Sequence, residues 1–168
     1  MAGTTYRRLL PVLAAVLIAT GCAPTFPSHI TERVDARIKY ADLMKDPETY
    51  KGKWVMLAGD IVTARAEKDG STYLEILQRP AYSNGKPMDT DESGGRFIAV
   101  SREFLDPAVY GRGRVITIVG EVVGDSVKPL GAVAYRYPLL EVQALHLWDP
   151  YSSPRTNVSI GVGVFHRF

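Results

Sequence analysis

Five stretches of the chain are rich in β-branched, aromatic and other apolar residues and are bounded by turn-forming residues, so each predicts a β-strand. They are residues 55–64, 72–78, 97–100, 115–123 and 137–148, and residues 67–71 predict a hairpin turn between the first two. In the last stretch Leu140, Val142 and Ala144 alternate with polar residues, which predicts a strand with one buried face. Gly59 lies in the middle of the first stretch, where a glycine usually marks a bulge or a tight bend.

The segments between these strands offer little helix. Asp46, Pro47 and Gly52 suit the cap, the first position and the left-handed end of one short helix. Residues 34–44 are weakly periodic and predict a partly helical entry, and a brief helical turn is expected after Ser101. Five strands in this order, with a helical element before the fourth, predict a mainly β protein built as a small OB-like Greek-key barrel. An open α+β sheet is the alternative, since the helices are too few and short for a doubly wound fold.

The amino-terminal segment has the features of an export signal. Arg7 and Arg8 precede an apolar run at 9–19, and no acidic residue comes before Cys22. Such a run is too short to span a bilayer and is typical of a signal peptide. Two alternatives stay open: an ordinary signal peptide followed by a chance cysteine, and a twin-arginine signal, which the residues around the arginine pair fit poorly.

Cys22 is the only cysteine in the chain, and its position directly after Thr20 and Gly21 resembles a bacterial lipobox. The resemblance implies that the Cys22 thiol receives a diacylglycerol, that the chain is cut after Gly21, and that the new amino terminus takes a fatty acid such as palmitate. Ala19 departs from the leucine usual at that position. Three acyl chains suffice for stable anchoring. Because Ala23, and not Asp, follows the cysteine, the resemblance implies an outer-membrane, periplasm-facing protein.

Charge and composition change after removal of such a signal. The chain carries 20 Lys and Arg against 18 Asp and Glu, and Arg7 and Arg8 account for the difference. The remaining chain is formally neutral, which argues against a nucleic-acid partner. With one cysteine no disulfide can form within the chain, so a single packed core must stabilise the domain.

The chain is therefore expected to have four segments. They are a signal peptide at 1–21, a tether at 22–33, the OB-like barrel at 34–148, and a β-prone tail at 149–168. The tail alternates from Val158 and ends in Phe168, like the closing strand of an outer-membrane barrel, although one such strand cannot make a pore. We expect residues 157–168 to pair as an edge strand on the core or with a partner, and disorder is the alternative.

Seven short pieces occur in the order seen in the starvation-inducible Slp-type outer-membrane lipoproteins. They are YKGK at 50–53, GDIV at 59–62, LEIL at 74–77, GRFIA at 95–99, FLDPAVY at 104–110, GRVITIVG at 113–120 and HLW at 146–148. Over roughly residues 22–148 the chain resembles that family. The resemblance implies a lipid-anchored envelope protein with a stress-associated role, contacts with other envelope proteins, and no catalytic residue. Only Cys22 carries over as a functional position.

Candidate catalytic chemistry is sparse. His146 has the same parity as Leu140 and Val142, so it is expected to point inward as a hydrogen-bonded structural histidine. No nucleophile has an identifiable base, and no cofactor motif is present in the sequence. We therefore expect a protein that is not an enzyme and holds no cofactor.

The acidic loop at 89–94 resembles the first half of a calcium-binding loop. Oxygen-bearing residues occupy its first, third and fifth positions and Gly94 the sixth. The twelfth position requires a bidentate Glu and is Val100. We expect a solvated loop and no metal.

Tyr110, Arg112 and Arg114 form a small basic and aromatic cluster. OB-like barrels often bind ligands on one face, so these residues are the candidate site for an anionic envelope ligand such as a glycan or a lipid head group. Two functions follow from the sequence: an envelope structural or stress-associated role, and, as the alternative, a module that binds a small envelope ligand. A groove onto which the three side chains converge would favour the ligand module.

Overall fold

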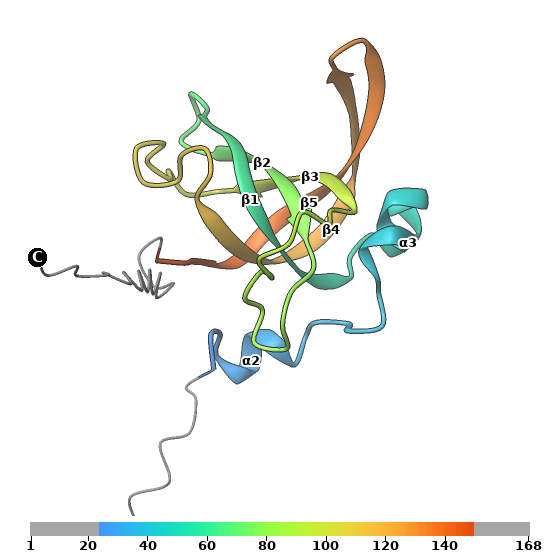
Figure 1. Ribbon diagram of the computed structural model, residues 1–168, viewed down its shortest axis with the longest axis vertical. Coiled ribbons are helices and arrows are strands. Elements are labelled where there is room, and N and C mark those ends of the chain that lie inside the picture. Colours follow the sequence, from blue (N-terminus) through green and yellow to red (C-terminus); the bar gives the residue numbers. More distant parts are fainter. Residues whose placement is uncertain (1–23, 150–168) are drawn as a thin grey trace, which may run out of the picture.

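The computed structural model describes residues 24–149, and within this range the chain forms a β-barrel closed by five strands. The strands are β1 (Trp54–Ala66), β2 (Thr72–Arg79), β3 (Gly95–Ser101), β4 (Val115–Leu130) and β5 (Val133–Leu147). Their order around the barrel is β1-β2-β3-β5-β4, and β4 closes back onto β1 (Figure 1). Every pairing is antiparallel except a short parallel pairing of β3 with β5. This order confirms the OB-like barrel, and the open α+β sheet is wrong.

The barrel interior is filled by the inward faces of all five strands. Its largest fully buried side chains include the following: Phe97, Leu43, Ile61, Leu74, Ile76, Ile116, Ile118 and Leu140. Leu43 comes from helix α3 (Tyr40–Lys45), so this helix contributes to the same core. Burial of so many large apolar side chains supplies the main stabilisation of a chain that has no disulfide.

The strands bend where their register shifts. In β1 the shift lies between Ile61 and Thr63, two residues beyond the predicted position at Gly59. Gly59 instead permits a close approach of β1 and β2, because a Cβ atom there would overlap the Leu77 carbonyl. Between β4 and β5 one register shift lies at Gly120, where β5 has the extra residue, and a second lies between Val122 and Gly124, where β4 has it. The prediction that the strands at 55–64 and 115–123 are neighbours is confirmed.

A bulge in β5 reverses the prediction for His146. Val119 pairs with Ala144 and the next residue of β4 pairs with Val142, so Gln143 is an extra residue in β5. Beyond the bulge the inward parity passes to Leu145 and Leu147, which pack against the core. His146 therefore lies on the outside of the barrel, and the inward placement predicted from strict alternation is wrong.

The helical elements are short. Pro47–Tyr50 form the 3-10 helix η1, and Gly52 follows it with a φ of 79°, which confirms the predicted stop. Asp46 precedes η1 but its carboxylate accepts from the Thr49 hydroxyl rather than capping the backbone. The helical turn predicted after Ser101 does not form, and the chain before β4 instead makes a hydrogen-bonded turn closed by backbone bonds onto the Asp106 carbonyl.

The predicted tether at 22–33 is only partly correct, because its described part packs on the barrel. Helix α2 (Ser28–Thr31) begins there, and Phe26 is only 4% exposed. Phe26 forms a second buried cluster with Trp54 and Val119 on the outside of the barrel. Its apolar ring gains more from this contact than from water, although Pro and Ser residues surround it in the sequence.

No helix within residues 24–149 is long and apolar enough to cross a membrane.

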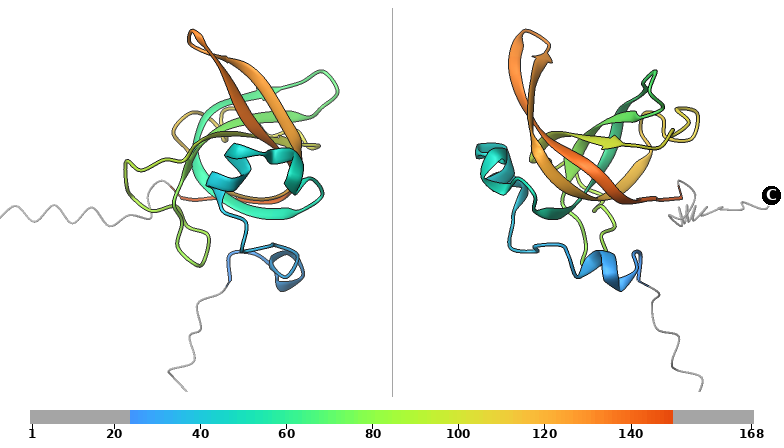
Figure 2. Two further views of the ribbon diagram at one scale, coloured as in Figure 1. Left: turned by 90° about the vertical axis from the view of Figure 1, so that its right-hand side faces the viewer. Right: turned by 180° about the vertical axis from the view of Figure 1, so that it is seen from behind.

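Strands β4 and β5 continue far beyond the predicted ranges as a two-stranded arm. Their pairing runs without a break from Asp125 opposite Pro138 to Leu130 opposite Val133 at the tip. The arm rises on the side of the barrel away from α2, the same side as the β1–β2 turn (Figures 1 and 2). The predicted signal peptide at 1–21, Cys22, and the tail beyond Asp149 lie outside the described residues.

Candidate functional site

The arm folds over the outward face of β2 and β3. The Tyr137 hydroxyl of β5 donates to the Glu75 carboxylate of β2 at 3.4 Å. Since β5 adjoins β3 and not β2, the Tyr137 side chain must cross β3 to reach Glu75. The residue of β3 opposite Glu75 is Ile98, which points outward between Phe97 and Ala99 and is nevertheless only 4% exposed. Ile98 is thus buried on the face that the Tyr137 side chain crosses.

Further contacts hold the base of the arm in place. The Tyr135 hydroxyl accepts from the Arg96 backbone N–H at 2.9 Å, and the Tyr135 and Tyr137 rings lie 4.8 Å apart in an edge-on arrangement. The Arg96 guanidinium pairs with Glu75 at 2.6 Å. Burial, and then the Glu75 charge, raise the pKa of Tyr137, so its phenol stays protonated as a donor. These contacts hold the base of the arm against β2 and β3.

Tyr73 lies between two cations at the free end of this face. The Arg65 guanidinium of β1 is 5.7 Å from the centre of the Tyr73 ring, and the Lys128 ammonium of the arm is 5.4 Å from it. These three side chains line an open pocket of about 530 Å³ together with the β1–β2 turn, which contributes the following: Glu67, Lys68, Asp69 and Ser71. The arm thus provides one wall of the pocket and the turn the other.

The pocket combines an aromatic ring with an excess of positive charge. Arg65 is paired with Glu67 at 2.7 Å. Asp69 is held by hydrogen bonds from Ser71, which lower the pKa of its carboxyl. Within residues 24–149 neither Lys68 nor Lys128 forms an ion pair, so both leave positive charge in the pocket available to a ligand. An aromatic ring can stack on a sugar ring, and the flanking ammonium groups can bind the carboxylates of the same ligand.

The predicted site residues do not converge. The Arg114 guanidinium donates to the Val109 carbonyl at 2.9 Å and to the Trp148 carbonyl at 3.4 Å, so it ties the chain before β4 to the end of β5. Tyr110 packs partly buried against the core, while Arg112 is exposed. The arrangement gives Arg114 a structural contact, and binding of a ligand by this cluster stays a prediction.

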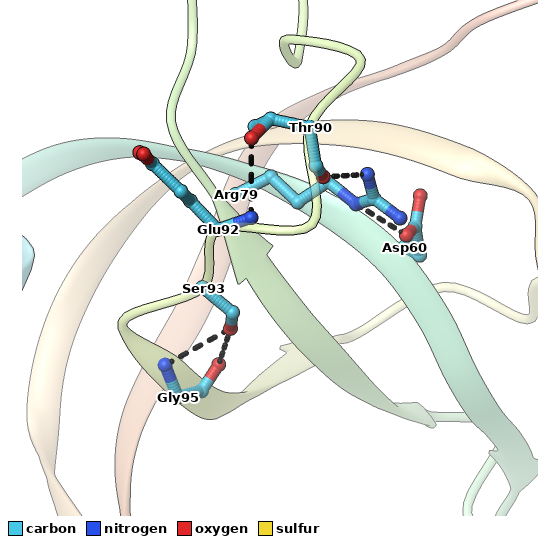
Figure 3. Close-up of polar contacts among 6 residues, drawn as sticks. All are labelled: Asp60, Arg79, Thr90, Glu92, Ser93 and Gly95. Carbon is cyan, nitrogen blue, oxygen red and sulfur yellow. Dashed lines mark hydrogen bonds and ion pairs between the residues drawn. The ribbon is translucent and has the colours of Figure 1, made fainter.

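The loop that resembles a calcium site is fastened to the barrel by Arg79 (Figure 3). The Arg79 guanidinium pairs with Asp60 at 2.6 Å and donates to the Thr90 carbonyl. Glu92 contributes its backbone N–H to the Thr90 hydroxyl, and its side chain points away from the Arg79 pair (Figure 3). Within residues 24–149 no group of three or more His, Cys, Asp and Glu side chains is placed to hold a metal ion.

A larger pocket of about 600 Å³ lies beside the end of β3 and is lined in part by two opposed carboxylates, Glu121 and Glu141. Each has a donor: the Trp54 indole donates to Glu121 at 3.3 Å, and Arg102 pairs with Glu141. Both carboxylates therefore have side-chain partners within the barrel.

A family model described as the outer membrane lipoprotein Slp family matches residues 19–163. The chain belongs to the Slp family. It is 25% identical over 159 residues to the outer membrane protein Slp of Escherichia coli K12, and the match covers 92% of this chain and 83% of that protein. It is 30% identical over 106 residues to the uncharacterized lipoprotein YeaY of the same strain, covering 63% of this chain and 54% of YeaY, so it spans about half of that relative.

Membership of the Slp family makes this an outer-membrane lipoprotein, as the lipobox at Cys22 predicts. Among solved structures, the chain is similar to a small single-stranded DNA-binding protein from Streptomyces coelicolor, with a TM-score of 0.39 and 10% identity over 58% of this chain and 94% of that one. That likeness is too weak to indicate nucleic-acid binding by this chain.

Only part of the Tyr73 pocket could be predicted from the sequence, for a physical reason. Tyr73 and Arg65 face each other across β1 and β2, and this pairing follows from the hairpin turn that the sequence does predict. Lys128 reaches Tyr73 only because the arm curls over β3, and the stretch that contains Lys128 has no alternation strong enough to predict a strand. The local sequence pattern therefore predicts the pairing of Arg65 with Tyr73 but not the contact with Lys128.

Proposed function

We propose that this outer-membrane lipoprotein is a non-catalytic binding module, held at the periplasmic face by acylation of Cys22, and that it serves an envelope structural or stress-associated role. The observation that carries the proposal is Tyr73 between the Arg65 and Lys128 cations in an open pocket. In OB-like barrels the face of β2 and β3 and the loops beside it commonly bind chain-like ligands.

The ligand class follows from charge and position. The described chain begins at Pro24, just before α2, whereas the β1–β2 turn and the arm that line the pocket lie on the other side of the barrel (Figures 1 and 2). A module anchored at Cys22 thus turns the pocket away from its own membrane. The ligand that fits is an anionic glycan of the periplasm, which offers sugar rings to Tyr73 and carboxylates to Lys128.

A binding assay with purified cell-wall sacculi tests this proposal. The wild-type lipoprotein in detergent is expected to co-sediment with sacculi, and Tyr73→Ala is expected to weaken binding by about tenfold, which corresponds to about 1.4 kcal/mol. Lys128→Gln should weaken binding and reduce its salt dependence. Arg112→Gln is the matched control and should bind as the wild type does.

Two results would contradict the proposal. Loss of binding in Arg112→Gln with full binding in Tyr73→Ala would return the site to the cluster predicted from the sequence. Absence of any binding by the wild type would leave the role to protein contacts, for which the arm offers the exposed side chains of Val127 and Val133. Crosslinking in intact envelopes would then identify the partner.

A further inference from the structure

Very little chain separates Cys22 from the folded barrel. Phe26 is 4% exposed and is packed against Trp54 and Val119. A fully extended chain spans at most about 3.6 Å per residue, so the Cα atom of Phe26 lies within about 14 Å of that of Cys22. An acylated Cys22 therefore cannot release the barrel into the periplasm on a long tether. The side of the barrel that carries Phe26 must lie next to the lipid.

The turn at 81–87 lies on this same side. Pro24, Thr25 and Phe26 line a pocket of about 310 Å³ together with Ser83 and Asn84 of the turn. The loop that contains the turn extends toward the same end of the barrel as α2 (Figures 1 and 2). The turn and the amino-terminal segment thus form one surface.

Hydrogen bonds make this turn rigid. The Tyr82 backbone N–H donates to the Lys86 carbonyl at 2.9 Å, and the Gly85 N–H donates to the Tyr82 carbonyl at 2.8 Å. The buried Thr117 hydroxyl donates to the Gly85 carbonyl at 2.7 Å and accepts from the Trp148 indole at 2.9 Å. The barrel wall therefore fixes the turn, which needs no ordering when it meets another surface.

The side chains that the turn presents suit a lipid interface. Tyr82 is 56% exposed although it is large and apolar over most of its surface. The Lys86 ammonium lies 5.7 Å from the Trp148 ring. Tyrosine and lysine are both favoured at the head-group level, because each joins an apolar body to a polar end.

We infer that the turn at 81–87, with the exposed Tyr82 next to its tip, docks on the lipid surface beside the acylated Cys22 and sets the orientation of the barrel. This inference rests on the acylation of Cys22 proposed above. The bound surface is small, and the acyl chains supply the affinity while Tyr82 and Lys86 supply the orientation. The orientation in turn directs the Tyr73 pocket toward the periplasm.

Single-cysteine labelling tests the docking. An acylated Cys22 has no free thiol, so Tyr82→Cys carries the one reactive thiol and takes one spin label. Val133→Cys is the matched control, because Val133 is 60% exposed and lies at the tip of the arm. Each acylated variant is placed in vesicles of phosphatidylethanolamine and phosphatidylglycerol, and collisions of the label with a water-soluble relaxation agent are measured.

We expect the collision rate at position 82 to be lower by about threefold or more in vesicles than in the soluble Cys22→Ser, Tyr82→Cys protein, with no change at position 133. Equal rates at 82 in both forms, in a chain that mass spectrometry shows to be acylated, would overturn the docking and leave the anchor intact. A chain without acyl groups would overturn the anchor and the docking together. Protection at 82 in intact envelopes but not in vesicles would assign the surface to a protein partner and overturn the lipid assignment.

Discussion

Replacing Phe26 with Ala tests whether the amino-terminal segment is part of the folded barrel. The Phe26 ring is buried among Trp54 and Val119 and lies 6.4 Å from the His146 ring. Truncation of a buried Phe to Ala usually costs about 3–5 kcal/mol. Because this cluster lies on the outside of the barrel and the chain near its start can partly rearrange, we expect the lower end, about 3 kcal/mol.

Urea unfolding of the soluble Cys22→Ser protein, followed by tryptophan fluorescence, measures this cost. Phe104→Ala is the matched control, because Phe104 is 61% exposed and its truncation should change the free energy of unfolding by less than about 0.5 kcal/mol. A cost below about 1 kcal/mol for Phe26→Ala would show that the segment is a loose tether. The barrel would then no longer be held close to the lipid by the packing of Phe26.

Three further substitutions test the packing of the barrel. Thr117→Val keeps the shape but leaves the Trp148 indole and a buried carbonyl without their partner, so thermal unfolding should show a loss of about 1–3 kcal/mol. Gly59→Val forces a side chain against the backbone of β2 and should cost about 3 kcal/mol or more in the same assay. Tyr40→Phe removes a buried hydroxyl that has no hydrogen-bond partner among the described residues, so stability at pH 7 should stay equal or rise. Burial raises the pKa of Tyr40 in the folded protein above the value of about 10 in the unfolded chain. The free energy of unfolding should therefore be constant below about pH 10 and fall as the pH rises further, because the unfolded tyrosine loses its proton first. In Tyr40→Phe this fall at high pH should be smaller.

The strand positions and their closure into a barrel were predictable, because inward residues repeat every second position and turns separate the strands. Strict alternation predicts the wrong face for His146 because one extra residue, Gln143, shifts the alternation, and a bulge leaves no mark in the residue types. The sequence predicts a tether around Phe26 because the neighbouring residues are typical of loops. The tertiary contact of Phe26 with Trp54 is what packs this segment on the barrel.

The sequence predicts only part of the candidate site. The hairpin that pairs Arg65 with Tyr73 is a local structure and its turn is visible in the sequence. The contribution of Lys128 depends on a long-range contact across β3, which no local pattern encodes. The cluster around Arg112 was close in sequence, but Arg114 turns its guanidinium to backbone carbonyls and away from any shared ligand.

The mass of the amino-terminal peptide of the membrane-extracted protein tests the central claim most directly, because the proposed orientation of the barrel and of the pocket depends on anchoring at Cys22. We expect a mature chain that begins at Cys22, with a diacylglycerol on the sulfur and a fatty acid on the amino group, and we expect Cys22→Ser to remain unprocessed or to leave the membrane. A soluble periplasmic chain with a free Cys22 thiol would contradict the claim.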